Sequence, residues 1–260
     1  MATQYTSILY EVRDHVATIT LNRPHDANSL NEALSTETLD ALIRSEENNE
    51  VRAVVITATG RFFCAGADLK SFYTQPGALK TRVSFIHVAI SRIVRAPLPV
   101  IGAINGTAAG GGMGLACACD LIVAAESAKF VMAYTRRGLS PDGTTTYFLP
   151  RRIGIGRALE LAYLNRTLSA GEALEWGLVN KVVPDAALAG EAYSMAAQLA
   201  QGPTKAFAAA KRLMHSGCVE TLETQIENEL RGIYEMAASE DTKEAIRAFN
   251  EKRTPVFKGR

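Results

Sequence analysis

The feature that most constrains the fold is a repeated pattern in which a short apolar run leads into a glycine-rich loop. Residues 54–56 precede the loop at 61–70, and residues 97–104 precede the loop at 105–114. A third apolar run follows at 121–123. Short strands, glycine-rich turns and helices in this alternation are typical of βαβ units with right-handed crossovers. The pattern therefore predicts an α/β fold.

The rest of the chain divides by its hydrophobic periodicity. Residues 8–22 alternate apolar and polar side chains, which predicts a β-hairpin. Residues 71–81, with Pro76 and Gly77 among polar neighbours, are expected to form a loop. We divide the chain into an α/β core at 1–195 and a helical C-terminal region at 196–260. Helical spacing predicts helices at 31–49, 157–163, 170–176, 190–199, 204–215, 222–236 and 242–251.

Charge and composition exclude several classes of protein. The net charge is +1, whereas general nucleic-acid or membrane-surface binders carry a basic excess. The four histidines and four cysteines show no zinc-type spacing, so we expect no metal and buried, reduced thiols. The chain contains no uncharged apolar run of about 18 residues and no secretory apolar segment at its start. We therefore expect a cytoplasmic protein.

The two glycine-rich loops can expose backbone amides to a ligand. Small residues at 65–67 allow close approach of a ligand, and the amide of Ala67 would point outward if a helix begins near Asp68. Gly111 can offer a second amide in the same way. Two amides that converge on one oxygen form an oxyanion hole. Each loop alone is equally consistent with a tight turn that binds nothing.

Six motifs occur in a fixed order along the chain: LNRP at 21–24, FCAGADLK at 63–70, NGTAAGGG at 105–112, CDLI at 119–122, GLSP at 138–141, and AGEA with WGLV at 170–179. The chain resembles the crotonase (enoyl-CoA hydratase/isomerase) superfamily, whose order of motifs it follows over nearly its whole length. The resemblance implies a spiral of ββα units, a helical trimerisation region, and a homotrimer or dimer of trimers. It also implies an acyl-CoA thioester substrate, no cofactor beyond the CoA of that substrate, and oxyanion amides at Ala67 and Gly111.

The catalytic positions favour an isomerase over a hydratase. Hydratases of this family place two glutamates beside the thioester, and the matching positions here are Gly114 and Tyr134. Asp142 follows the GLSP motif, which is similar to the isomerase branch that includes ring-1,2-epoxyphenylacetyl-CoA isomerases. One base is enough to move a double bond. Alternatively, Asp142 caps the helix that follows it. Tyr134 is expected to form a pocket wall or to hydrogen-bond the substrate.

The remaining site residues follow from the resemblance. The loop at 71–83, which includes Phe72, would enclose the acyl group together with His87 beyond it. Phe249 and Lys252 would cover the CoA that is bound to a neighbouring subunit. Without the motif register, the lysines would be interpreted as ordinary solvated charges, and Asp68 as a helix cap. The other residues expected at the CoA are His25, Asp26, Ala27, Ala65, Asp68, Leu69 and Lys70.

These observations leave three functions open. The leading hypothesis is an acyl-CoA isomerase that shifts a double bond through a thioester enolate held by Ala67 and Gly111, with Asp142 as the base. The first alternative is an atypical enoyl-CoA hydratase or thioester hydrolase in which Asp142 or Tyr134 orients water. The second is a non-catalytic CoA-binding module that keeps the fold without the hydratase glutamates.

Overall fold

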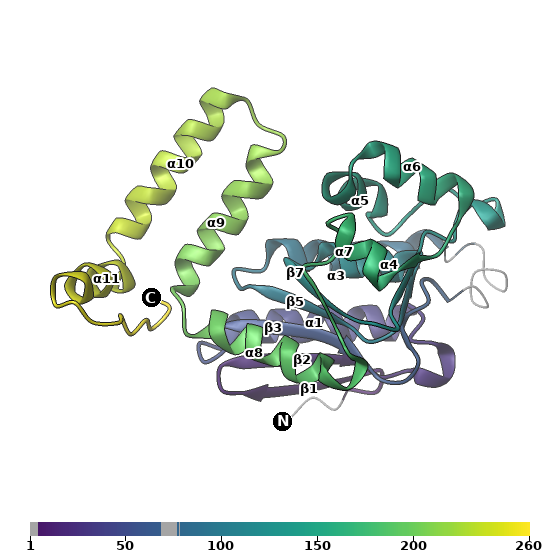
Figure 1. The fold of residues 1–260 in the computed structure, drawn as a ribbon, viewed down its shortest axis with the longest axis horizontal. Helices are drawn as coiled ribbons and strands as arrows, with labels where there is room; N and C mark the ends of the chain where they lie inside the picture. Colours follow the sequence, from purple (N-terminus) through teal and green to yellow (C-terminus); the bar gives the residue numbers. More distant parts are fainter. Residues whose placement is uncertain (1–4, 69–76, 78) are drawn as a thin grey trace.

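The computed structural model describes residues 5–68, 77 and 79–260, with Leu79 and Arg82 described by their backbone alone (Figure 1). Its larger sheet has six strands in the order β1-β2-β3-β5-β7-β10. The first two strands form the predicted antiparallel hairpin, and each later neighbour pairs in parallel. The strands are β1 (Ile8–Arg13), β2 (Val16–Leu21), β3 (Ala53–Ala58), β5 (Val100–Ile104), β7 (Leu121–Ala125) and β10 (Lys181–Val183).

A smaller sheet of four short strands lies beside the first, in the order β4-β6-β8-β9. The chain passes from a strand of the large sheet into a strand of the small sheet and then into a helix, three times in succession. The result is the predicted α/β spiral of ββα units. The strands of the small sheet are β4 (Phe62–Cys64), β6 (Thr107–Ala109), β8 (Lys129–Val131) and β9 (Leu168–Ser169), and the three helices are α3 (Leu79–Arg95), α4 (Gly111–Ala118) and α5 (Thr145–Ile153).

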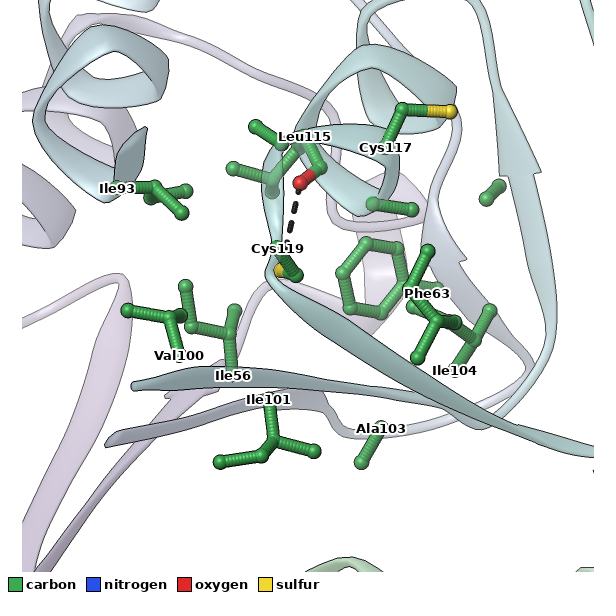
Figure 2. Close-up of a cluster of buried hydrophobic side chains, with 14 of the residues drawn as sticks. Ile56, Phe63, Ile93, Val100, Ile101, Ala103, Ile104, Leu115, Cys117 and Cys119 are labelled. Carbon is green, nitrogen blue, oxygen red and sulfur yellow. Dashed lines mark hydrogen bonds between the residues drawn. The ribbon is translucent and has the colours of Figure 1, made fainter. Parts of the chain in front are cut away.

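The core fills both sides of the large sheet. α8 (Leu188–Ala200) packs against β2, β3, β5 and β7, whereas α1 (Glu32–Glu47) packs against β1 and β2 and against α3 (Figure 1). β3 and β5 are rich in Val and Ile because parallel strands covered on both faces are apolar throughout. Figure 2 shows the side chains that fill the space between these strands and α4, among them Ile56, Phe63 and Leu115.

Helix α3 is the main element that the sequence-based description missed. We expected a loop over residues 71–81 and assigned no helix between that loop and Pro97, but a helix begins at Leu79 and ends at Arg95. Its buried residues Ile86, Ile90 and Ile93 follow helical spacing and pack in the core. Residues 71–76 and 78 of the expected loop lie outside the described residues.

The C-terminal helices form an arm that stands away from the sheets (Figure 1). Residue 195, our sequence-based boundary, lies within α8, and the chain leaves the sheet at Gly202 and Pro203. The division into 1–195 and 196–260 therefore stays a prediction. The predicted helices are otherwise present within a few residues, as α6 (Ile155–Leu164), α7 (Ala170–Glu175), α9 (Thr204–Gly217), α10 (Leu222–Ala237) and α11 (Glu240–Asn250).

The cysteines agree only in part with the expectation of buried thiols. Cys64, Cys117 and Cys119 are buried, and burial raises the pKa of Cys64 to about 12, so this thiol stays protonated. Cys218, however, is exposed at the end of α9.

Across the described part of the chain, His, Cys, Asp and Glu side chains form no group that could hold a metal ion. None of the helices described is at once long enough and apolar enough to span a bilayer.

Candidate active site

The backbone of Ala67 is held so that its amide points away from its neighbouring segment. Leu30 N–H donates to Gly66 O at 2.8 Å, and Asp68 N–H donates to Leu30 O at 3.2 Å. This is a parallel bridge between Leu30 and Ala67, in which the residues that flank Ala67 supply the hydrogen bonds. The N–H of Ala67 therefore faces the other side, and no acceptor bonds it among the described residues.

Gly111 supplies a second free amide at the start of α4. The helix begins after Gly110, whose φ of +52° and ψ of −122° suit glycine. Met113 and Gly114 donate back to Gly110 O at 3.0 and 3.2 Å. The N–H of Gly111 belongs to the first turn of the helix and has no intrahelical acceptor.

The two loops are packed against each other at these amides. A Cβ at Gly66 would lie 3.2 Å from Gly111 N and 2.8 Å from Ala109 O, and Gly66 has a φ of +92°. A Cβ at Gly111 would lie 4.0 Å from Ala67 N. Glycine at position 66 thus allows the two loops to approach each other closely. As a result, the amides of Ala67, after β4, and of Gly111, at the start of α4, face one cavity.

That cavity has a volume of about 220 Å³ and connects the two loops with the segment between β8 and α5. It brings together four of the residues that we expected in the site, namely Ala65, Ala67, Gly111 and Asp142, with Tyr134 in the wall. Small and apolar side chains form most of its surface. The lining residues are Ala65, Gly66, Ala67, Val83, Gly110, Gly111, Ala133, Tyr134, Arg137, Leu139, Ser140 and Asp142.

Asp142 is paired with a histidine from a distant helix. His87 Nε2, on α3, lies 2.5 Å from Asp142 Oδ1, and the two side chains are 44% and 32% exposed. The alternative role as a helix cap is not what the structure shows, because α5 begins at Thr145 and Thr144 occupies its N-cap position. The carboxylate is thus held by a ring nitrogen and remains accessible at the cavity.

Tyr134 is a wall residue whose hydroxyl is already engaged. Its OH donates to the main-chain oxygen of Asp142 at 2.8 Å. Burial, as the first cause, and the nearby charge of Asp142 raise the pKa of Tyr134 well above its usual value. The phenol therefore keeps its proton and serves to hold the Asp142 segment in place.

Gly114 leaves no room for a second carboxylate. A Cβ at this position would lie 1.8 Å from Gly143 O and 2.9 Å from Gly143 C, which is far inside contact distance. The space that a longer side chain would enter is thus filled by the backbone of the segment that carries Asp142. Among the residues that line the cavity, Asp142 is the one carboxylate in the described part of the chain.

The first turn and the loop at 61–68 form one connected surface next to the cavity. Ala65 N–H donates to Ala27 O at 3.0 Å, which places two of the residues expected at the CoA side by side. The buried amide of Asn28, which sequence reasoning missed, donates to Thr59 O at 2.9 Å and to Phe62 O at 2.7 Å. Asn28 thus anchors the turn that carries His25, Asp26 and Ala27.

Arg23 also lies at this turn. Its guanidinium is 2.7 Å from Asp26 Oδ2 and 3.8 Å from Asp68 Oδ2. Both acidic residues that we expected near the CoA are therefore partnered by the same cation. The LNRP motif contains Arg23, but its role as the link between the two loops could not be derived from sequence spacing.

The remaining predicted residues lie either outside the described residues or on the C-terminal arm. Leu69, Lys70 and Phe72 lie outside the described residues. Phe249, at 82% exposed, belongs to α11, and Lys252 follows that helix. Figure 1 shows α11 at the far end of the arm from α4. Their contact with the CoA of a neighbouring subunit stays a prediction.

Comparisons with known proteins place the chain in a family. The family model for enoyl-CoA hydratase/isomerase matches residues 11–260. A probable enoyl-CoA hydratase of Rhodobacter capsulatus is 41% identical over 98% of this chain and 99% of its own length. The 1,2-epoxyphenylacetyl-CoA isomerase of Escherichia coli is 39% identical over 97% of this chain and 98% of the relative. The 4-chlorobenzoyl coenzyme A dehalogenase-1 of an Arthrobacter species is 36% identical over 94% and 91%.

A solved structure extends the similarity to the whole fold. The crystal structure of enoyl-CoA hydratase from Bacillus anthracis is 39% identical and superposes with a TM-score of 0.94, covering 98% of this chain and all of that one. The relatives carry the names of three different reactions, hydration, isomerisation and dehalogenation. The fold, the paired backbone amides and the match over residues 11–260 together show that this chain belongs to the enoyl-CoA hydratase/isomerase family of the crotonase superfamily, whose members act on acyl-CoA thioesters.

Proposed function

We propose that this protein is an acyl-CoA isomerase that moves a carbon–carbon double bond from the 3,4 to the 2,3 position of an enoyl-CoA thioester. The observation that carries the proposal is that Asp142 is the single carboxylate among the described residues lining a cavity that is also lined by Ala67 and Gly111. Hydration across a double bond calls for an acid and a base, whereas isomerisation can use one group for both steps. The packing at Gly114 supports the same choice.

The chemistry follows from the positions of these groups. Asp142 removes a proton from C2 of the 3-enoyl thioester, and the C–H electron pair moves into the thioester carbonyl. The amides of Ala67 and Gly111 stabilise the negative charge that develops on the thioester oxygen. The protonated Asp142 then returns the proton to C4, and the double bond forms between C2 and C3. No cofactor beyond the CoA of the substrate takes part.

His87 has a positioning role in this scheme. Its ring nitrogen lies 2.5 Å from one carboxylate oxygen of Asp142, so the second oxygen is left for the substrate. A carboxylate that is fixed in this way moves little between taking and returning the proton.

The test is an assay of the purified chain with 3-enoyl-CoA and 2-enoyl-CoA thioesters of several lengths, followed by ultraviolet absorbance and mass. We expect the double bond to migrate without a change in mass. Asp142→Asn should lower the rate by about 10²–10⁴-fold, because that is the usual contribution of a general base. Its affinity for CoA should stay unchanged, since Asp142 lies on the acyl side. An unchanged rate in Asp142→Asn would remove this residue from the mechanism.

A second candidate function uses water, and the His87–Asp142 contact is the observation that favours it. A ring nitrogen beside a carboxylate can accept a proton from an attacking water molecule. The similarity to a 4-chlorobenzoyl coenzyme A dehalogenase makes replacement of a halide by hydroxyl the specific form to test. Release of chloride from a chlorobenzoyl thioester, or gain of one water by an enoyl thioester, would favour this candidate over isomerisation.

A further inference from the structure

Arg137 is one of the residues that line the cavity that holds Asp142. It belongs to a short 3-10 helix, Thr135–Arg137, in the segment between β8 and α5. Its Nη1 donates to Ala133 O at 3.0 Å. A guanidinium has five N–H donors, so this one bond leaves most of them for another partner.

No acidic side chain of the described residues forms an ion pair with Arg137. The residues that the structure does not describe include no Asp or Glu. They are 1–4 (MATQ), 69–76 (LKSFYTQP) and 78 (Ala). Leu79 and Arg82, which are described by their backbone alone, have no acidic side chain either. Its neighbour Arg136 differs, because its Nη2 donates to Asn165 O at 3.1 Å and it does not line the cavity.

The segment that carries Arg137 indicates that this residue contacts the acyl part of the substrate. It is carried by the same segment as Asp142, the group that must reach the acyl carbon atoms. Ala65, which is expected at the CoA, and Ala67, whose amide would bind the thioester oxygen, come from a different segment, the loop that follows β4. An acyl chain that passes Asp142 thus extends along the wall to which Arg137 belongs.

We propose that Arg137 binds a carboxylate at the far end of the acyl group, so that the preferred substrates are CoA monothioesters of unsaturated dicarboxylic acids. This inference rests on the proposed isomerase function and names its substrate class. The planar fork of a guanidinium matches a carboxylate through two parallel hydrogen bonds. A cavity of about 220 Å³ suits a short chain, which would bring a terminal carboxylate within reach of this residue.

The experiment compares kcat/KM for two matched substrates, 3-hexenoyl-CoA and the CoA monothioester of 3-hexenedioic acid. The wild-type chain should prefer the dicarboxylic substrate. Arg137→Gln should reduce kcat/KM for that substrate by about 10–100-fold, the range expected for hydrogen bonds between charged groups, and leave the monocarboxylic substrate nearly unchanged. Arg137→Lys should keep part of the preference. The control Arg136→Gln, which removes one charge next to the cavity, should keep all of it.

Two results would overturn the proposal. An equal loss for both substrates in Arg137→Gln, together with weaker binding of free CoA, would mean that this cation contacts the nucleotide. A wild-type preference for the monocarboxylic substrate would also exclude a carboxylate site.

A binding experiment tests Arg137 even if neither thioester isomerises. Calorimetry measures the affinity of the Asp142→Asn variant for the two compounds, and tighter binding of the dicarboxylic compound does not need turnover. Failure of the isomerase function and failure of the carboxylate site are thus separate outcomes.

Discussion

Gly114 and Gly143 are packed so closely that the backbone of one segment fills the side-chain space of the other. A Cβ at Gly114 would lie 1.8 Å from Gly143 O, and Gly143 itself adopts a φ of +58°. A Cβ at Gly143 would lie 2.9 Å from Gly111 Cα, next to the amide that we assign to the oxyanion hole. The segment that carries Asp142 is therefore seated directly on α4, and glycine at these positions sets the distance between base and amides.

Gly114→Ala tests this packing. The added methyl group must displace the carbonyl of Gly143, which should cost about 1–3 kcal/mol of stability and move Asp142 away from the thioester. We expect a lower unfolding midpoint in denaturant and a loss of isomerase kcat. The control is Gly156→Ala, an exposed helical position where a Cβ meets nothing within 4 Å. The control should keep full activity, and an active, fully stable Gly114→Ala variant would contradict the geometry described above.

The residues of the site could be predicted only in part. Ala67, Gly111 and Asp142 stand in motifs, and the structure brings all three to one cavity. The contact of His87 with Asp142 joins residues 55 positions apart, so local sequence could suggest no more than that His87 is near the acyl group. Arg137 was missed because a single exposed arginine gives no periodic or motif signal. Side-chain partners of this kind depend on the tertiary fold.

At the scale of helices and strands, the sequence predicted the longer strands, whereas it did not predict the short strands of the small sheet or helix α3. β3, β5 and β7 are apolar runs of five or six residues, and each was expected. The strands of the small sheet have two or three residues, too few for any periodic pattern to stand out. α3 has a helical stripe of apolar residues, but many of them are β-branched, and packing in the core overrides their weak helix propensity.

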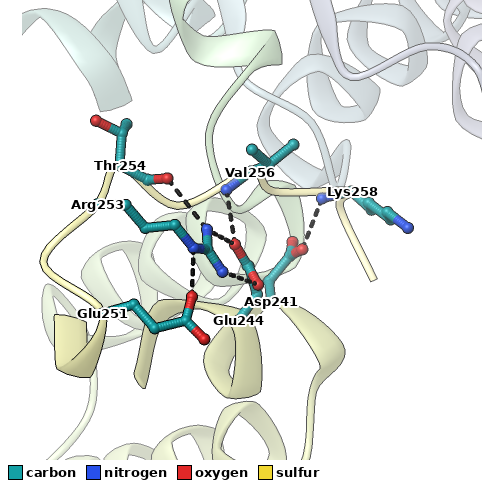
Figure 3. A network of polar contacts seen from close by, with 7 residues as sticks. All are labelled: Asp241, Glu244, Glu251, Arg253, Thr254, Val256 and Lys258. Atoms are coloured by element: carbon teal, nitrogen blue, oxygen red, sulfur yellow. Dashed lines mark hydrogen bonds and ion pairs between the residues drawn. The ribbon is translucent and has the colours of Figure 1, made fainter. Parts of the chain in front are cut away.

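The segment after α11 is held by carboxylates of that helix (Figure 3). Glu244 accepts from Arg253 Nη1 at 2.5 Å and from Val256 N–H at 3.1 Å. Asp241 accepts from Lys258 N–H at 2.7 Å and from Gly259 N–H at 2.8 Å. The tail is thus fixed mainly by hydrogen bonds to side-chain carboxyl groups of this helix.

We expect this attachment to weaken at low pH. The hydrogen bonds from Arg253 and then from Val256 lower the pKa of Glu244 from 4.5 to about 2. Because the pKa is lower in the folded state, the contribution of Glu244 is complete above about pH 4.5 and is lost as the pH falls toward 2. The protection factor of the Val256 amide, which compares its exchange rate by NMR with that of an unprotected amide at the same pH, should fall over this range. In Glu244→Gln the exchange should be fast already at neutral pH, whereas wild-type protection that persists to pH 2 would exclude this role of Glu244.

At the scale of the whole molecule, the arm presents an apolar stripe that no other part of the described chain covers. α10 packs on α9 through its inner face, where Gly232 is buried and a Cβ there would lie 3.1 Å from Leu213 Cδ1. A separate face carries charged residues. Between them runs a stripe of exposed side chains at helical spacing, namely Leu222 (71% exposed), Ile226 (54%), Leu230 (59%) and Ile233 (67%).

This stripe leads us to expect that the chain self-associates through its arm, as the trimer predicted from the family resemblance requires. A contiguous exposed apolar surface is costly in water and usually marks an interface. Leu230→Asp places a charge within the stripe and should give monomers in light scattering, with weaker binding of acyl-CoA if Phe249 of one subunit covers the CoA of another. Arg231→Asp, on the charged face, should keep the assembly. If Leu230→Asp remains assembled to the same size as wild type, the subunits associate through another surface, and the placement of Phe249 and Lys252 at a neighbouring site loses its support.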